Sequence, residues 1–166
     1  MKKLILSSIL IISTILSYSQ SRETSKFIDI KKEEAAIKRV IESETRHFLK
    51  RDFKEQRRSL LQDETLIGLG AWKDRYLHII GWKEMKSFFE EFYQKYPEPD
   101  NLQLEFSNYQ IKVFPKSAWA FYHQKTLDNN GKIISKHLSG RFLEKVEGEW
   151  KISFITFADV TSYGED

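Results

Sequence analysis

Three polar side chains could do acid–base or electrostatic chemistry if the fold brought them together: Glu44, His137 and Arg141. Glu44 interrupts an otherwise apolar helical face, and a desolvated carboxyl group can serve as a general base. His137 could act as an acid or a base. The guanidinium of Arg141 could clamp an anion or a carbonyl group, or stabilise charge that develops during a reaction. These three residues are therefore the candidate catalytic residues.

Each of the three also has a structural interpretation. Arg141 could form an internal ion pair with Glu44, because an unpaired buried charge is very costly. His137 could be a hydrogen-bonded wall residue beside Gln124. Both interpretations stay open at the level of the sequence.

Other kinds of site find little support. The four histidines show no close ligand spacing and there is no cysteine, so we predict no metal. The chain has no Gly-rich phosphate loop and no serine nucleophile elbow, and we expect no cofactor. The basic pairs Lys50-Arg51 and Arg57-Arg58 lie among acidic residues. We interpret them as solvated surface and do not predict nucleic-acid binding.

The segment from Asn108 to Phe157 must position most of the polar residues, and it reads as three long strands joined by two tight turns. Asn130-Gly131 and Glu147-Gly148 suit hairpin turns, which fix the register of the strands. The first turn predicts the opposite pairs Gln124–His137, Tyr122–Ser139 and Ala120–Arg141. The second predicts the opposite pairs Leu143–Ile152, Arg141–Phe154 and Ser139–Thr156.

These registers place a polar group and an apolar group side by side on one sheet face, which suggests a pocket next to a packed core. The polar group comprises Tyr122, Gln124, His137, Ser139, Arg141 and Thr156. The apolar group comprises Leu143, Trp150, Ile152 and Phe154. Trp72 and Tyr76 lie in an aromatic segment, Gly68 to Ile80, which we expect to form an irregular rim. The predicted ligand-binding residues are the polar group together with Trp72, Tyr76 and Phe154.

The opposite sheet face is also apolar by the same registers. It carries Trp119, Phe121, Leu138, Phe142, Ile155 and Phe157, and Tyr109, Ile111 and Val113 could join them. A homodimer through this outer face would cover it. The competing interpretation is that helices cover this face and the polar face meets water.

The remaining elements precede the sheet, so the order of helices and then strands predicts an α+β domain with helices on one side of a curved sheet. The expected elements are a helix from about Lys31 to Lys50 capped by Asp29, a short helix from Asp52 to near Leu61, a short strand from Thr65 to Leu69, a helix that starts at Gly81, and a first long strand from Leu102 to Phe114.

The N-terminus reads as an export signal. Lys2 and Lys3 precede an apolar run that is too short to span a membrane, and small residues stand before a cleavage position after Ser19. We therefore predict a signal peptide over 1–19, a flexible arm over 20–29 and one domain over 30–166. The mature chain is expected to be periplasmic or extracellular, free of the membrane, and close to neutral, because removing both lysines lowers the net charge from +3 to +1.

The chain resembles the NTF2-like, SnoaL-like superfamily, especially the branch of unknown function labelled DUF4440, over about Glu33 to Tyr163. The resemblance rests on a long first helix followed by Asp52, on Gly81 opening an aromatic helix, on Ala118-Trp119 in a strand, and on the run from Arg141 to Lys145 that leads to Trp150. It implies a cone in which a curved antiparallel sheet wraps around the first helix, with a pocket at the open end and frequent dimers. The association domain of a calmodulin-dependent kinase is similar, and its pocket arginine corresponds in spacing to Arg141.

Three functions are compatible with this pattern. The first is an exported domain that binds a small, partly apolar molecule in the cone pocket. The second is an enzyme of the isomerase, dehydratase or hydrolase type that uses Glu44 or His137 with Arg141. The third is a dimerisation or assembly module whose function is the apolar outer face.

Overall fold

The computed structural model describes residues 28–162. The predicted signal peptide, 1–19, and residues 20–27 of the predicted arm lie outside the described residues. Helix α2, Ile30–Leu49, begins at the predicted cap, where the Asp29 carboxylate accepts a hydrogen bond of 3.1 Å from the Lys32 backbone N–H. Its buried face carries Ile37, Ile41, Glu44 and Thr45.

Two further helical segments match the expected positions. Asp52 caps the short helix α3, Phe53–Gln56, which continues as a 3₁₀ turn, η1, over Arg57–Ser59. Helix α4, Gly81–Lys95, starts at the predicted glycine and ends before Tyr96. Among the described residues, no helix combines the length and apolar character needed to cross a membrane.

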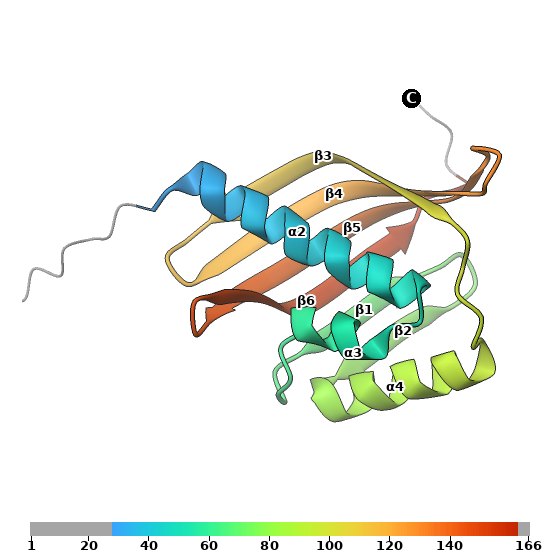
Figure 1. The fold of residues 1–166 in the computed structure, drawn as a ribbon, viewed down its shortest axis with the longest axis horizontal. Helices are drawn as coiled ribbons and strands as arrows, with labels where there is room; N and C mark the ends of the chain where they lie inside the picture. The colour runs from blue at the N-terminus through green and yellow to red at the C-terminus, as the bar shows by residue number, and fades with distance from the viewer. Residues whose placement is uncertain (1–27, 163–166) are drawn as a thin grey trace, which may run out of the picture.

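The described residues contain one sheet of six strands in the order β2-β1-β6-β5-β4-β3. The strands are β1 Ile67–Ala71, β2 Tyr76–Ile80, β3 Gln103–Val113, β4 Ser117–Leu127, β5 Ile133–Val146 and β6 Glu149–Asp159. All neighbouring strands are antiparallel except β1 and β6, which are parallel, so the sheet is mixed. It curves beneath α2 and does not close, and α4 lies along its β2 edge (Figure 1).

The predicted irregular rim from Gly68 to Ile80 is wrong, because this segment forms the hairpin of β1 and β2. The two glycines of β1 permit close packing that a larger residue would block. A Cβ atom added at Gly70 would lie 2.5 Å from the Phe157 ring, and one at Gly68 would lie 2.7 Å from the Met85 side chain. The sequence did not predict this strand fully, because glycine has a low strand propensity and the residues that pack against it are distant in the chain.

The register of the hairpin between β4 and β5 is confirmed, since Gln124 pairs with His137, Tyr122 with Ser139 and Ala120 with Arg141. The register between β5 and β6 is confirmed only near the turn, where Leu143 pairs with Ile152. Beyond that pair, the register shifts by one residue, and Arg141 pairs with Ile155 instead of Phe154, while Ser139 pairs with Phe157 instead of Thr156.

This shift is a β-bulge at Ser153, the extra residue of β6, and it reverses the faces of the residues that follow. Phe154 and Thr156 therefore lie on the outer face, and their predicted place on the face that carries Arg141 is wrong. Ile155 and Phe157 lie on the inner face, so their predicted place in the outer face is also wrong. Gly140, the partner of Thr156, supports this arrangement, because a Cβ atom there would lie 2.9 Å from the Thr156 methyl group.

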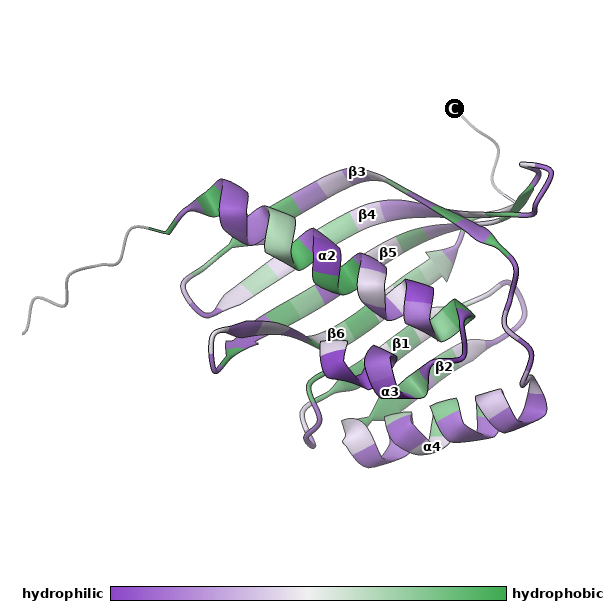
Figure 2. Ribbon diagram, in the orientation of Figure 1, coloured by the Kyte–Doolittle hydropathy of each residue, from purple (hydrophilic) through white to green (hydrophobic). Residues whose placement is uncertain are grey.

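The core fills the space between α2 and the inner face of the sheet. It contains Ile37, Ile41, Leu60, Ala118, Ala120, Tyr122, Leu143, Trp150 and Ile152. Tyr109, Ile111 and Val113 of β3 also pack against this core, so the expectation that they join the outer face is wrong. Hydrophobic and hydrophilic residues alternate along the strands, as Figure 2 shows, which is the pattern of a sheet with one face against a core.

The N-terminal end of α2 is fixed by polar contacts with the β5–β6 hairpin. Glu33 accepts hydrogen bonds from the Lys145 ammonium at 2.6 Å and from the Trp150 indole N–H at 2.7 Å. The bond from Lys145, more than that from Trp150, lowers the pKa of the Glu33 carboxyl group. Trp150 and Arg141 thus both face α2, as the sequence predicted.

Candidate functional site

A cavity of about 1130 Å³ opens between the C-terminal half of α2, helix α4, the β1–β2 hairpin and the inner face of β4 to β6. One end is polar and carries Glu44, Gln124, His137, Ser139 and Arg141. The rest is mainly apolar and is lined by Phe48, Leu69, Trp72, Tyr76, Leu77, Met85, Phe88, Phe89, Phe92, Tyr96, Ile155 and Phe157. Its size and its few convergent polar groups are typical of small-molecule sites.

Arg141 is the buried cation at the polar end, with 5% of its surface exposed. Its Nη1 group donates to two backbone carbonyls, of Gly140 at 3.0 Å and of Thr156 at 3.2 Å. Its Nη2 atom lies 3.7 Å from a carboxylate oxygen of Glu44. The Nε–H group has no partner among the described residues. The guanidinium is therefore held by strand backbone on one side and keeps donors that the protein does not use.

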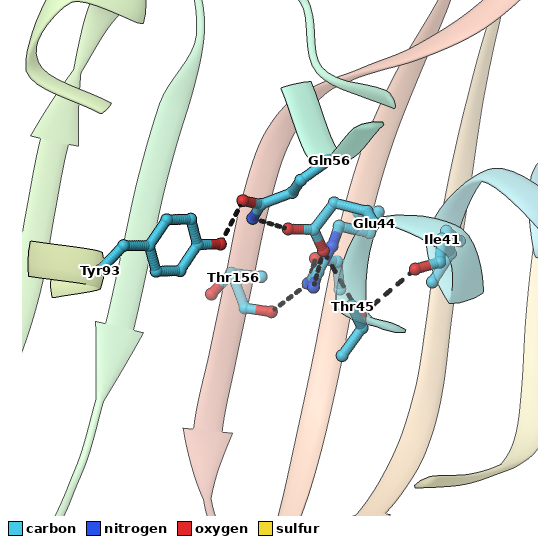
Figure 3. Close-up of polar contacts among 8 residues, drawn as sticks. Ile41, Glu44, Thr45, Gln56, Tyr93 and Thr156 are labelled. Atoms are coloured by element: carbon cyan, nitrogen blue, oxygen red, sulfur yellow. Dashed lines mark hydrogen bonds and ion pairs between the residues drawn. The ribbon is translucent and has the colours of Figure 1, made fainter. Parts of the chain in front are cut away.

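Glu44 is the counterion of Arg141, so the ion-pair interpretation is confirmed. Figure 3 shows a chain of contacts in which Tyr93 donates to Gln56, and the Gln56 amide donates to the Glu44 carboxylate at 2.9 Å. The Thr45 hydroxyl donates to the second carboxylate oxygen at 3.3 Å. Direct contacts from α2, α3 and the sheet thus fix the Glu44 carboxylate, and Tyr93 of α4 holds Gln56 in place; Glu44 as a whole is 5% exposed. Burial, more than the nearby Glu44 charge, raises the pKa of Tyr93.

Tyr122 lies behind the polar end and does not line the cavity. Its side chain is fully buried, stacks on Tyr109 with ring centroids 5.0 Å apart, and lies 5.7 Å beneath the Arg141 guanidinium. Burial raises the pKa of its hydroxyl to about 12. Tyr122 therefore packs beneath Arg141. It was predicted to contact a ligand, but it is not among the residues that line the cavity.

His137 lies where the polar end meets the aromatic wall. Its ring contacts the Phe157 ring edge-on at 5.5 Å, and its strand partners are Gln124 on β4 and Asp159 on β6. Burial lowers the pKa of the imidazole from its usual 6.5, Asp159 opposes this shift and Arg141 adds to it. The folded state therefore favours the neutral imidazole.

This shift predicts a pH dependence of stability. Because the pKa of His137 is lower in the folded state, the unfolded chain binds more protons as the pH falls through 6.5, and the stabilisation by neutral His137 is lost in that direction. We expect urea midpoints of the wild type to fall more steeply between pH 8 and pH 5 than those of His137→Gln. Equal slopes for the two proteins, or an NMR titration of His137 with a pKa above 6.5, would contradict this expectation.

The aromatic wall comes from elements that are distant in the sequence. Phe48 of α2 stacks on Phe92 of α4 with ring centroids 5.2 Å apart. At the other side, the Trp72 ring meets the Phe157 ring edge-on at 4.8 Å, and the Arg75 guanidinium lies 4.7 Å above Trp72. Tyr76 lines the cavity but is 82% exposed, so it lies at the mouth.

The structure thus brings together most of the residues selected from the sequence. Gln124, His137, Ser139, Arg141, Trp72 and Tyr76 line one cavity with Glu44. Phe154 and Thr156 lie on the other face of the sheet because of the bulge, although the Thr156 carbonyl still holds Arg141.

Sequence reasoning missed two groups of lining residues. Ile155 and Phe157 were assigned to the wrong face, and only knowledge of the bulge could have corrected this. The second group is the aromatic residues of α4, none of which is among the ligand-binding residues predicted from the sequence. The unusual density of Phe and Tyr in this helix was the available signal.

Arg51 was also missed, because it was interpreted as solvated surface. Its side chain is 8% exposed and bridges the end of α2 to the segment after α4. It donates to the Tyr96 carbonyl at 2.9 Å, to the Phe48 carbonyl at 3.0 Å and to the Asp100 carboxylate at 2.7 Å. Arg51 therefore fixes the two helices that form one side of the cavity.

The described part of the chain contains no group of three or more His, Cys, Asp and Glu side chains that could hold a metal ion. The polar end can instead donate hydrogen bonds from Arg141 and offer the amide of Gln124, the hydroxyl of Ser139 and the imidazole of His137. These groups are suited to orienting the polar end of a small molecule.

Comparison with known proteins identifies the fold. No family model matches the chain, and no curated protein matches it. Among solved structures, an NTF2-like protein of unknown function from Pseudomonas putida KT2440 is 13% identical with a TM-score of 0.62, covering 77% of this chain and 87% of that one. An NTF2-like protein of unknown function from Shewanella oneidensis MR-1 is 13% identical with a TM-score of 0.58, covering 76% and 98%.

The association domain of CaMKII from C. elegans is also similar, with 17% identity and a TM-score of 0.57 over 76% of this chain and 95% of that domain. These likenesses confirm the predicted NTF2-like α+β fold and the predicted similarity to the kinase association domain. At these identities they show the fold alone.

Proposed function

We propose that this NTF2-like domain binds a small, partly apolar molecule in the cavity. The observation that carries the proposal is a buried guanidinium that lines one end of a large space whose other walls are aromatic. An open space of this size beside Arg141 and Phe92 would add nothing to the packing of the core. A bound molecule would fill it and accept a hydrogen bond from Nη2 of Arg141, whose contact among the described residues is the 3.7 Å ion pair with Glu44.

In this proposal, Arg141, His137, Gln124 and Ser139 orient the polar end of the ligand. The apolar body lies between the Trp72–Phe157 pair on the sheet side and the aromatic face of α4. Catalysis by Glu44 or His137 stays a prediction. Glu44 already accepts hydrogen bonds at both oxygens, which favours a role in holding Arg141.

Native mass spectrometry of protein purified without detergent tests the proposal. We expect a co-purified small molecule on the wild type and its loss from Phe92→Glu, which places a charge in the aromatic wall. Ile30→Glu is the control, because Ile30 is exposed at the far end of α2. A wild-type protein that carries nothing and binds no member of a fragment library would contradict the proposal.

We further propose that the mature domain is exported and lies in the periplasm or outside the cell, as the basic and apolar N-terminus indicates. The intact mass of the protein recovered from the exported fraction should lack residues 1–19. An intact N-terminus on a protein retained in the cytoplasm would contradict this proposal.

The outer sheet face supports a homodimer. Trp119, Phe121 and Leu138 are between 42% and 47% exposed, and the Trp119 ring contacts the rings of both Phe121 and Phe142. A cluster of exposed aromatic residues on a regular sheet is typical of an interaction surface. The kinase association domain among the similar structures agrees with assembly through this fold.

We expect Phe121→Glu to convert the protein from dimer to monomer, because the charge would be buried in the interface. Sedimentation velocity should show one species of half the mass, whereas Ile30→Glu should stay dimeric. A wild type that sediments as a monomer at high concentration would contradict the dimer and leave the cavity proposal intact. A Phe121→Glu monomer that still binds ligand would separate binding from assembly.

A further inference from the structure

The lining of the cavity carries no net formal charge. Its charged residues are the four bases Arg51, Arg75, Lys95 and Arg141 and the four acids Glu44, Glu91, Glu98 and Asp100. Two of the bases form ion pairs with acids of the same set, Arg141 with Glu44 and Arg51 with Asp100. The cavity is therefore not a concentrated positive site, although arginines line it.

At the buried polar end, one positive charge and one negative charge compensate each other. The side chains of Arg141 and Glu44 are each 6% exposed, so water screens neither charge well. A carboxylate ligand placed on Arg141 would be a second anion beside Glu44, and this part of the cavity would become negative. Arg51 does not offset that charge, because Asp100 is its partner at 2.7 Å.

A neutral acceptor avoids this conflict. Of the five N–H groups of Arg141, only those on Nη1 have hydrogen-bond acceptors among the described residues. The Nε–H group is enclosed by the protein, so Nη2 is the donor that a ligand can reach. A carbonyl oxygen can accept from Nη2 without adding charge, because it needs a donor and no counterion. The aromatic side chains of Trp72, Phe157 and Phe92 favour a flat, apolar body next to that carbonyl.

We propose that the cavity selects an uncharged, flat and largely apolar molecule with a carbonyl-type acceptor at Arg141, and that Glu44 excludes the matching carboxylate. This inference rests on the proposed function, since it specifies the chemical class of the same ligand. Glu44 is then the specificity-determining residue of the site, acting through the charge of Arg141.

Two probes of nearly the same shape test the proposal, 2-acetylnaphthalene and 2-naphthoate. Titration calorimetry at pH 8, where His137 is neutral, should give at least tenfold tighter binding of the ketone to the wild type. A carboxylate that binds as tightly as the ketone, or more tightly, overturns the charge-selection inference and leaves the proposed function standing. Failure of both probes and of a fragment library overturns the proposed function and this inference with it.

Glu44→Gln tests the cause of the selection. The variant keeps an acceptor for the Gln56 amide but leaves the Arg141 charge uncompensated, so the preference should reverse by at least tenfold toward 2-naphthoate. Glu90→Gln is the matched control, because Glu90 is exposed on α4, pairs with Lys86 and does not line the cavity. It should keep the wild-type preference. If Glu44→Gln folds and keeps the wild-type preference, the role of Glu44 is overturned. If Glu44→Gln does not fold, the comparison of the two probes on the wild type still tests whether the cavity prefers the ketone to the carboxylate.

Discussion

Replacing Arg141 by Met is expected to destabilise the domain by about 3–5 kcal/mol, the usual cost of leaving one member of a buried ion pair without its partner. The substitution removes the only cation paired with Glu44 among the described residues and the bonds to the carbonyls of Gly140 and Thr156. Glu44 would then be buried with only neutral hydrogen-bond donors around it. Urea denaturation followed by tryptophan fluorescence measures the change.

A double-mutant cycle separates the ion pair from the rest of this loss. Glu44→Met should also lower the free energy of unfolding, because it leaves the Arg141 charge buried without its counterion. The double variant should be more stable than either single variant, since two apolar side chains need no partners. Costs that simply add would show that the pair is not coupled and that Arg141 is held by its backbone contacts alone.

Replacing Arg51 by Met is expected to cost about 2–4 kcal/mol, although a basic residue after a helix end is usually dispensable. The side chain donates to backbone carbonyls of α2 and of Tyr96 and to the Asp100 carboxylate. Methionine keeps the packing against Phe92 but leaves these acceptors without their donor. The end of α4 should loosen, and hydrogen exchange of the amides near Tyr96 should become faster.

Lys50→Met is the matched control for this prediction. Lys50 is the neighbouring basic residue and is exposed, so its replacement should change the free energy of unfolding by less than about 0.5 kcal/mol. Similar losses for the two variants would contradict the structural role assigned to Arg51.

The sequence predicted the elements whose signals are local. The cap at Asp29, the start of α4 at Gly81 and the hairpin turn at Glu147-Gly148 each depend on a few adjacent residues, and all three are confirmed. In the β4–β5 hairpin, the loop spans Asn129 to Gly131 between Asp128 and Lys132, so the predicted turn centre at Asn130-Gly131 is wrong. A one-residue register shift between Thr126 and Leu127 restores the predicted pairing in the rest of the two strands. For this reason Gln124, Ser139 and Arg141 could be assigned to one face without a structure.

The sequence could not predict features that depend on residues far apart in the chain. The bulge at Ser153 is a property of two paired strands, and a one-residue shift exchanges every face assignment beyond it. Phe154 and Phe157 were exchanged for this reason. Arg51 finds its partner Asp100 49 residues away, and no local pattern distinguishes it from Lys50.

A crystal structure of the purified wild-type protein soaked with the fragment library tests the central claim most directly. The account predicts occupants inside the cavity, with a ligand oxygen within hydrogen-bonding distance of the Arg141 guanidinium and a flat body against Trp72 and Phe157. Fragments that gather only on the outer sheet face around Phe121, with the cavity empty at saturation, would contradict it.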